Sequence, residues 1–302
     1  LPIASGPYRP ESAKLGRDIT YVRDKAYWGA ELPVRRGQYN FDRITYKLYL
    51  DDTSRFEGLK AGEYDFKREF ISRNWARQYK GRAFDSGEVV KKVFHNRNPG
   101  DFQGYIFNLR KPKFHDVRVR EAIALAMDFE WLNRQMFYGL YKRVDGYFPN
   151  SDFHASGLPD AKELALLEPL RAQLRPEVFG PARRSPSTAP PGSLRENLRK
   201  ARELLAEAGW TYRDGALRNA KGEPFVIEYL NAQPSGVRLL LPMQTALGKL
   251  GIELRVRNVD GALYQQRMDD FDFELSSLRI PGRTAPGSEL LEFFGSKAAS
   301  TP

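Results

Sequence analysis

The stretch that organises this chain is Gly104-Tyr-Ile-Phe-Asn-Leu-Arg-Lys-Pro-Lys-Phe-His-Asp-Val-Arg-Val-Arg-Glu-Ala-Ile-Ala-Leu-Ala-Met-Asp128. Its apolar run from Tyr105 to Leu109 predicts a buried strand, and Asp116 can cap the helix that follows. The apolar residues at helical spacing in this helix are Val119, Ala122, Ile123, Ala126 and Met127. Asp128 can open a second helix, 129–138, which stops at Gly139. This pattern alone leaves open whether the strand and helix only pack or also bind a ligand.

The part of the chain before this stretch mixes strands with short helices. Ser5-Gly6-Pro7-Tyr8 has the composition of a turn, and Asp51-Asp52 can cap a helix over 53–60. Apolar alternation or short apolar runs predict strands at residues 19–23, 41–50, 64–66 and 89–94. The loop 96–100 is then the candidate crossover between two lobes. This order predicts a mixed α/β fold.

The part after the stretch predicts a regular alternation of strands and helices. A helix over 161–174 should break or kink at Pro169, and the Pro-rich segment 175–192 should be an irregular loop. Ser193 and Glu196 form a capping box for the next helix. Strands and helices then alternate, at residues 225–230, 237–250, 252–259, 262–268 and 271–280. A β-α-β-α-β order favours parallel neighbours in one sheet.

Composition places the chain among globular proteins of one large or two ordinary domains. It has 302 residues, 41% of them hydrophobic, and no cysteine, so disulfides and thiolate metal sites are excluded. No run approaches the length of a membrane-spanning helix, and the start does not resemble a signal peptide. Because the first residue is Leu1 and not Met, we expect a processed chain or a fragment of a longer protein.

The net charge of +10 raises the question of nucleic acid or anionic lipid as a partner. The 48 basic residues are scattered among 38 acidic ones and do not form a basic run. We therefore expect a generally basic surface and no nucleic-acid binding.

Catalytic signatures are missing from the sequence. Phosphate-binding loops, the nucleophile elbow and the zinc-protease helix motif do not occur. His95, His115 and His154 stand singly, and the acids around Asp270 are adjacent in sequence and do not converge. We expect no enzyme activity, no metal site and no cofactor.

Aromatic residues at strand ends and turns are the more informative group. They are Tyr8, Tyr27, Trp28, Tyr105, Phe107, Tyr138, Tyr147, Trp210, Tyr229 and Tyr264. They can fill a core, or they can line a cleft for an extended ligand. Arg267 follows Tyr264 by three residues on a short helix and could fork onto a carboxylate or remain solvated.

Several motifs, taken in order, resemble family 5 extracellular solute-binding proteins, the peptide-, dipeptide- and nickel-binding receptors of ABC importers. They are Ser5-Gly6-Pro7-Tyr8, Asp24-Lys-Ala-Tyr27-Trp28-Gly29, Phe41-Asp42-Arg43-Ile44, Leu59-Lys-Ala-Gly-Glu-Tyr-Asp65, Phe107-Asn108 with Phe114-x-Asp116-x-Arg118-Val-Arg-Glu-Ala122, Ala201 to Trp210, and Leu250-Gly-Ile-Glu253. Further segments resemble the YejA-type branch, whose members take up oligopeptides and microcin C-like peptide conjugates: Gly37-Gln-Tyr-Asn-Phe-Asp42, Asp128-Phe-Glu-Trp131, Phe137-Tyr-Gly139 and Asp270-Phe-Asp272.

This resemblance implies an α/β fold of the periplasmic binding protein type II-like class, with two lobes and mixed sheets, present here in part. The implied division is 1–98 in a large lobe, 99–277 as the second, ligand-binding lobe, and 278–302 as a return segment. The resemblance further implies a monomeric periplasmic receptor that closes on a peptide or peptide-like ligand and delivers it to an inner-membrane ABC permease. Two alternatives remain: a structural or interaction protein that kept the fold, and a receptor for a non-peptide anionic solute.

The resemblance also gives candidate ligand-binding residues: Tyr105, Asn108, Tyr264, Arg267, Ser277 and Arg279. Peptide-binding relatives often place an Asp just after the last strand to hold the ligand's amino terminus. Here the segment 276–283 contains no acid, and its Arg279 and Arg283 favour carboxylate or phosphate groups instead.

Overall fold

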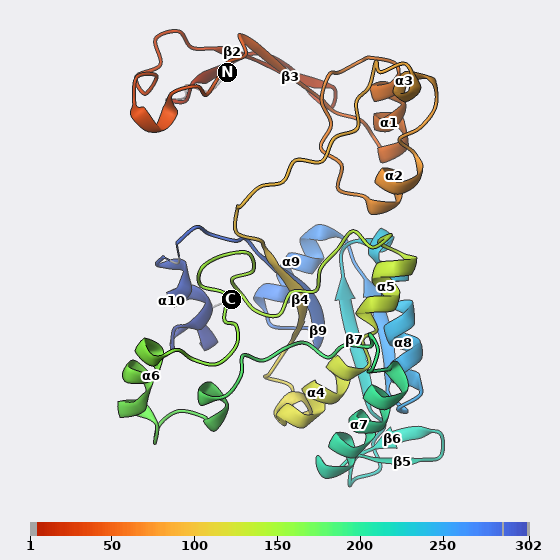
Figure 1. Ribbon diagram of the computed structural model, residues 1–302. Coiled ribbons are helices and arrows are strands. Elements are labelled where there is room, and N and C mark those ends of the chain that lie inside the picture. Colours follow the sequence, from red (N-terminus) through yellow and green to blue (C-terminus); the bar gives the residue numbers. More distant parts are fainter. Residues whose placement is uncertain (1–4, 286, 301–302) are drawn as a thin grey trace. The chain divides into compact units, whose positions relative to one another are not determined.

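The computed structural model describes residues 5–285 and 287–300, and the chain folds as two units, Leu1–Val93 and Phe94–Pro302 (Figure 1). Each unit has a sheet and a set of helices of its own. The predicted division into residues 1–98, 99–277 and 278–302 refers to the lobes of a longer protein and stays a prediction.

The first unit opens with a three-stranded antiparallel sheet. Its strands, in spatial order, are β1 (Tyr8–Lys14), β2 (Asp18–Arg23) and β3 (Arg43–Lys47). β2 and β3 confirm two of the predicted strands. β1 was not predicted, because it carries Pro10 and lacks apolar alternation. Proline is tolerated there because β1 is an edge strand, with a register shift between Pro10 and Ser12.

Three helices complete the first unit. They are α1 (Asp52–Lys60), α2 (Ser72–Arg77) and α3 (Arg82–Asp85). The predicted cap of α1 is confirmed, because the Asp51 side chain accepts the backbone N–H of Ser54. The strands predicted at 64–66 and 89–94 are wrong. A strand needs a neighbour to satisfy its backbone groups, and no strand of the described chain pairs with either segment.

The second unit is built on a four-stranded sheet in the spatial order β4–β9–β7–β8 (Figure 1). Its strands are β4 (Phe102–Phe107), β7 (Val226–Asn231), β8 (Glu253–Asn258) and β9 (Leu275–Ile280). β7 runs parallel to β8 and β9, which confirms the parallel arrangement predicted from the β-α-β-α-β order. β4 runs antiparallel to β9 and forms an edge of the sheet.

One face of this sheet packs on three helices. They are α4 (Val117–Leu125), α7 (Leu194–Glu207) and α8 (Leu241–Gly248). Their buried residues share one core with Ile227, Tyr229 and Leu275 of the sheet. The opposite face carries α9 (Gly261–Asp269), which contacts the side chain of Ser276. The two faces therefore differ: one is an apolar core and the other is partly polar.

The apolar stripe predicted for α4 is largely confirmed. Val119, Ala122, Ile123 and Ala126 are all at most 1% exposed. Met127 is only half-buried and lies two residues beyond the end of the helix at Leu125. Burial in the core, rather than helix propensity alone, explains why this segment is helical.

The second unit has further elements besides the core. They are α5 (Phe129–Gln135), α6 (Ala161–Leu167), α10 (Glu289–Phe294), the hairpin β5 (Thr211–Arg213) and β6 (Ala216–Arg218), and 3₁₀ turns at Pro112–Phe114, Glu168–Leu170, Pro176–Phe179, Pro234–Leu239 and Ala298–Ser300. The first unit has a 3₁₀ turn at Pro33–Arg35. The predicted break at Pro169 is confirmed, because the α-helix ends at Leu167 and a 3₁₀ turn follows.

The Pro-rich loop is held to the start of α5 by the Glu130 carboxylate. One oxygen accepts the Ser187 hydroxyl at 2.6 Å. The other accepts the backbone N–H and the hydroxyl of Thr188, at 3.0 and 2.8 Å. The same segment is also held by Asp128, which accepts the Thr188 hydroxyl, and by Asp145, which accepts the backbone N–H of Ser185 at 2.9 Å.

Replacing Glu130 with glutamine is expected to lower the free energy of unfolding at pH 7 by about 1–2 kcal/mol. Burial acts to raise the pKa of Glu130, but the hydrogen bonds from Ser187 and Thr188 outweigh it and lower the pKa to about 2. A carboxyl whose folded pKa lies below its unfolded value of about 4.3 stabilises the protein above that value and loses this stabilisation as the pH falls toward 2.

The difference between wild type and E130Q should therefore narrow between about pH 4 and pH 2, in urea denaturation at each pH. Glu292, at an exposed position on α10, serves as the control site, and E292Q should match wild type throughout. A difference that did not change with pH would show that the charge of Glu130 is not what holds the loop.

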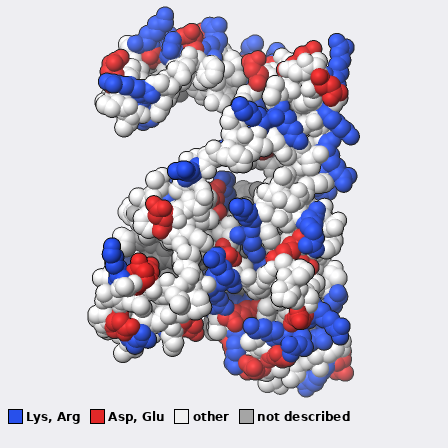
Figure 2. Space-filling model, viewed as in Figure 1, with Lys and Arg blue, Asp and Glu red and all other residues white. Residues whose placement is uncertain are grey.

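Basic and acidic side chains are interspersed on the visible face (Figure 2). Within the described part of the chain, no helix combines the length and the apolar character needed to cross a membrane. The expectation that nucleic acid is not a partner stays a prediction.

Candidate ligand-binding site

Tyr105 and Ser277 lie opposite each other in the ladder between β4 and β9. Directly opposed residues of an antiparallel ladder project to the same face, so their side chains form one patch. The ring of Tyr105 meets the ring of Tyr229 on β7 edge-on, with centroids 5.8 Å apart. Because Tyr229 is buried and Ser277 is exposed, this patch runs from the core to the surface.

Tyr264 reaches the same strand from the other face of the sheet. Asp260 caps the start of α9, and its carboxylate accepts two free backbone N–H groups of the first turn. The Tyr264 hydroxyl lies 2.9 Å from the hydroxyl of Ser276. The Ser276 hydroxyl donates to the backbone oxygen of Leu230 at 3.1 Å. This chain of hydroxyl groups ties α9, β9 and β7 together.

The buried phenols remain neutral at physiological pH. Burial raises the pKa of Tyr105 to about 12. Burial also raises the pKa of Tyr229, although a hydrogen bond with Ser277 acts in the opposite direction. Both hydroxyls are therefore uncharged and can each donate and accept a hydrogen bond.

Arg279 lies two residues beyond Ser277, on the same face of β9, and pairs with Asp101. Its Nε donates to Asp101 Oδ2 at 2.7 Å, and its Nη2 donates to the same oxygen. The other oxygen of Asp101 accepts the backbone N–H of Gly282 at 2.9 Å. A carboxylate therefore does lie at this end of β9, although the segment 276–283 contains none. Asp101 was not found from the sequence, because Asp101 and Arg279 are 178 residues apart in the sequence and no local pattern connects them.

Asn108 directly follows β4 and is buried against the turn between α9 and β9. Its Nδ2 donates to the backbone oxygens of Phe271 and Phe273, at 2.7 and 2.8 Å. Its Oδ1 accepts the backbone N–H of Arg110 at 3.0 Å. All of its side-chain donors are engaged by the protein, and only 2% of the residue is exposed.

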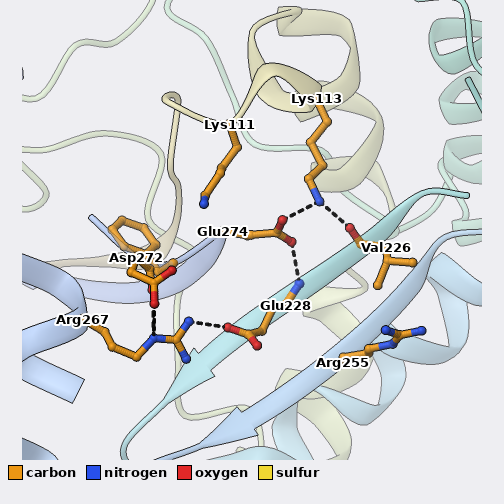
Figure 3. Close-up of a pocket in the computed structure, with 9 residues that line it drawn as sticks. Lys111, Lys113, Val226, Glu228, Arg255, Arg267, Asp272 and Glu274 are labelled. Carbon is orange, nitrogen blue, oxygen red and sulfur yellow. Dashed lines mark hydrogen bonds and ion pairs between the residues drawn. The ribbon is translucent and has the colours of Figure 1, made fainter. Parts of the chain in front are cut away.

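Arg267 lies at a charged hollow near the same turn, with a volume of about 340 Å³ (Figure 3). We use the name charged hollow for the space lined by Lys111, Lys113, Val226, Glu228, Arg255, Arg267, Asp272, Phe273 and Glu274. Arg267 Nη2 contacts Glu228 Oε1 at 2.7 Å, and its Nε contacts Asp272 Oδ2 at 2.9 Å. Its guanidinium thus forks onto two carboxylates of its own chain. Burial acts to lower its pKa, but these two carboxylates outweigh burial and raise it.

The structure separates the six predicted residues into two groups. Tyr105, Tyr264, Ser277 and Arg279 lie along β9, whereas Asn108 and Arg267 lie at the turn where β9 begins. We call the first group, with Tyr229 and Asp101, which were not among the six predicted ligand-binding residues, the β9 patch: Tyr105, Tyr229, Ser277, Arg279 and Asp101 on one side of β9, and Tyr264, which approaches β9 from the opposite face of the sheet. Tyr229 could have been found from its position near the carboxyl end of a parallel strand, where ligands of α/β sheets bind.

The β9 patch combines hydroxyl groups with one exposed ion pair. Such groups bind and orient polar ligands, but they contain no nucleophile beside a general base. Within residues 5–285 and 287–300, no group of three or more His, Cys, Asp or Glu side chains is arranged to hold a metal ion.

The family model of bacterial extracellular solute-binding proteins, family 5 Middle, matches residues 1–302. The chain belongs to this family. The resemblance found from the sequence motifs is thereby confirmed. Family 5 proteins are extracellular solute-binding components of ABC transporters, so the function of the family is binding and not catalysis.

Two curated relatives illustrate the YejA-type branch. The chain is 43% identical over 290 residues to an uncharacterized YejA protein of Escherichia coli, covering 96% of this chain and 48% of that protein. It is 36% identical over 300 residues to a probable peptide-binding YejA protein of Agrobacterium fabrum, covering 98% and 49%. The chain therefore spans about half the length of the curated relatives that it matches.

Two solved structures share the fold. AppA, an oligopeptide-binding protein of Bacillus subtilis in complex with a nonapeptide, matches 95% of this chain and 48% of its own, with a TM-score of 0.64 and 21% identity. NikA of Brucella suis in complex with Fe(III)-EDTA matches 99% and 51%, with a TM-score of 0.62 and 20% identity. The predicted periplasmic binding protein fold, α/β with mixed sheets, is confirmed.

Proposed function

We propose that the protein to which this chain belongs binds oligopeptides or peptide-like ligands in the periplasm and delivers them to an inner-membrane ABC permease. The observation that carries this proposal is the β9 patch, in which neutral hydroxyl groups lie beside an exposed Arg279–Asp101 pair. The printed name of the Agrobacterium fabrum relative, a probable peptide-binding protein, supports the same ligand class.

The chemistry of the β9 patch suits an extended ligand with both amide and charged groups. Tyr105 and Ser277 offer hydroxyls to backbone amides on one face of the sheet and Tyr264 offers one on the other, and Arg279 with Asp101 offers one charge of each sign. β4 is an edge strand, so an extended ligand can add backbone hydrogen bonds that do not depend on its sequence. Closure of two lobes would then exclude water from the bound ligand.

A receptor for a non-peptide anionic solute is the second candidate. Arg279 is 67% exposed and could exchange Asp101 for a carboxylate of the ligand. The solved structure of NikA holds a chelated metal, Fe(III)-EDTA, which shows that the fold accommodates solutes other than peptides. A third class, a structural or interaction protein, would show no saturable binding of small solutes.

Isothermal titration of the full-length protein with defined peptides of two to nine residues should give saturable binding. Ser277→Trp should abolish it, because Ser277 is exposed in the middle of the β9 patch and a bulky side chain there would occupy the ligand's place. The matched control is Thr211→Trp, at an exposed position of strand β5 away from the β9 patch. The expected loss is at least about tenfold in affinity, or about 1.4 kcal/mol.

Three outcomes separate the candidate functions. Peptide binding that Ser277→Trp abolishes and Thr211→Trp leaves intact would support the proposal. Binding of a dicarboxylate or chelate but of no peptide would favour the anionic-solute receptor. Equal peptide affinity for both variants would place the ligand elsewhere and overturn the role of the β9 patch.

A further inference from the structure

The charged hollow has walls that are fixed by ion pairs and hydrogen bonds (Figure 3). Lys113 Nζ contacts Glu274 Oε1 and the backbone oxygen of Val226, both at 2.6 Å. The other oxygen of Glu274 accepts the backbone N–H of Glu228 at 2.8 Å. Together with the fork of Arg267 onto Glu228 and Asp272, these contacts hold the side chains around an open space.

Some charged groups on these walls are left uncommitted. Lys111 is half-buried, and its ammonium has no hydrogen bond or ion pair with the described residues. Glu228 uses only Oε1, and Asp272 uses only Oδ2, in their bonds to Arg267. Within the described chain, Glu228 Oε2 and Asp272 Oδ1 accept no hydrogen bond. The hollow therefore offers both a cationic donor and anionic acceptors that no described residue uses.

The charges around the hollow balance. Four cations line it, namely Lys111, Lys113, Arg255 and Arg267, against the three carboxylates of Glu228, Asp272 and Glu274. Arg255 is paired with a fourth carboxylate, Glu253, at 2.7 Å. A ligand with a net charge would upset this balance, whereas a ligand that carries one charge of each sign would not.

We propose that the charged hollow is a second binding site, which takes a small zwitterion of the amino-acid class. The ligand's carboxylate accepts hydrogen bonds from Lys111, and its ammonium group donates to the free oxygens of Asp272 and Glu228. Phe273 and Val226 provide apolar surface beside the charges. The half-buried Lys111 and Glu228 thereby gain partners of opposite sign, which is the condition for keeping a charged group half-buried, and the more exposed Asp272 adds a second carboxylate.

This site is separate from the β9 patch. The charged hollow lies where β7 and β9 begin, whereas Tyr105, Ser277 and Arg279 lie further along β9. The inference rests on the charges of the hollow alone and does not depend on the proposed peptide-binding function.

The test uses the full-length protein with glycine as the probe, because glycine carries both charges and no side chain. The melting temperature should rise with glycine concentration and then level off. The expected Kd is on the order of 1 mM for so small a ligand. Sodium acetate and methylammonium chloride, which each carry only one of the two charges, should bind at least about tenfold more weakly. Lys111→Met should weaken glycine binding by about tenfold or more, because it removes the charged donor.

Three further variants make the result decisive. Lys200→Met, at an exposed position on α7, should leave glycine binding unchanged, and Asp272→Asn should weaken it even if Lys111→Met does not fold. Ser277→Trp should also bind glycine normally, which distinguishes this site from the β9 patch. Acetate binding as tight as glycine binding, glycine binding that survives both Lys111→Met and Asp272→Asn, or no saturable response of the wild type would each overturn the proposal.

Discussion

Replacing Gly282 with alanine is expected to lower the free energy of unfolding of this chain by about 3 kcal/mol. Gly282 follows β9 and lies against the segment that leads into β4. A Cβ at this position would come within 2.8 Å of the carbonyl carbon of Gly100 and 2.9 Å of that of Pro99. Real Cβ atoms do not approach backbone atoms so closely, so one of the two segments must move.

Little room is available for that movement, because both segments are tied in place. The backbone N–H of Gly282 donates to Asp101 at 2.9 Å, and Asp101 also holds Arg279. The backbone N–H of Gly100 donates to the oxygen of Pro149 at 2.7 Å. Separating the segments would therefore break hydrogen bonds as well as contacts, which is why we expect an effect at the upper end for a single added methyl group.

The measurement is urea denaturation of the chain and of a matched variant, Gly248→Ala. Gly248 ends α8 and has no atom within 4 Å of an added Cβ, so alanine there should be neutral or stabilise by up to about 1 kcal/mol through helix propensity. The expected result is a fall in the urea midpoint for G282A only. Equal midpoints for G282A and wild type would show that the two segments separate without cost.

The elements of the second unit that could be predicted are those in which apolar residues recur at a regular short spacing. The alternation of apolar residues from 225 to 280 led to β7, α8, β8, α9 and β9, and the stripe on α4 led to the core. Both signals are local, because they depend on residues a few positions apart. The same reasoning failed for 64–66 and 89–94, because an apolar run becomes a strand only when another strand is available to pair with it.

The site was predicted less completely than the fold. The resemblance to the family gave Ser277 and Tyr105 as candidate ligand-binding residues. Their position opposite each other depends on the register between β4 and β9, which no local pattern encodes. Asp101 was not predicted for the same reason: its partners, Arg279 and Gly282, are far from it in the sequence and meet it only in the folded chain. Long-range pairing, and not residue type, is what local sequence patterns leave undetermined.

Replacing Asn108 with alanine is expected to cost about 3–4 kcal/mol of the free energy of unfolding, the largest effect that we expect from a polar residue in this chain. The change removes three hydrogen bonds at once. It leaves the backbone oxygens of Phe271 and Phe273 and the N–H of Arg110 without their partner, at a position where Asn108 itself is 2% exposed. Water cannot readily replace the lost amide there, so the groups bear their desolvation cost.

The backbone at this turn gives a second reason for a large effect. Phe271 has φ of 54°, in the left-handed region that residues with side chains rarely adopt. Asn108 bonds to the carbonyl of this residue, and the guanidinium carbon of Arg110 lies 3.3 Å from the centroid of its ring. These contacts offset the conformational cost of the left-handed backbone at Phe271. The turn then fixes the end of α9 relative to β9.

Asn133→Ala is the matched control for this prediction. Asn133 on α5 also bonds the backbone through its amide, donating to the oxygen of Tyr141 at 2.8 Å and accepting its N–H at 3.1 Å. That site is open to solvent, so water can take over both bonds and the expected cost is at most about 1 kcal/mol. Urea denaturation of both variants gives the comparison, and similar costs for N108A and N133A would contradict the role of burial.

Asn108→Asp separates the loss of hydrogen-bond donors from the loss of volume. An aspartate has nearly the same shape, but its carboxylate would face the backbone oxygens of Phe271 and Phe273 and could not donate to them. Ionisation is therefore disfavoured in the folded state, so the pKa of this carboxyl should lie above its unfolded value. By linkage, N108D should be strongly destabilised at pH 7 and recover as the pH falls toward 4, whereas the deficit of N108A should not change with pH. Parallel pH profiles for the two variants would mean that Asn108 acts through its volume and not through its two amide hydrogens.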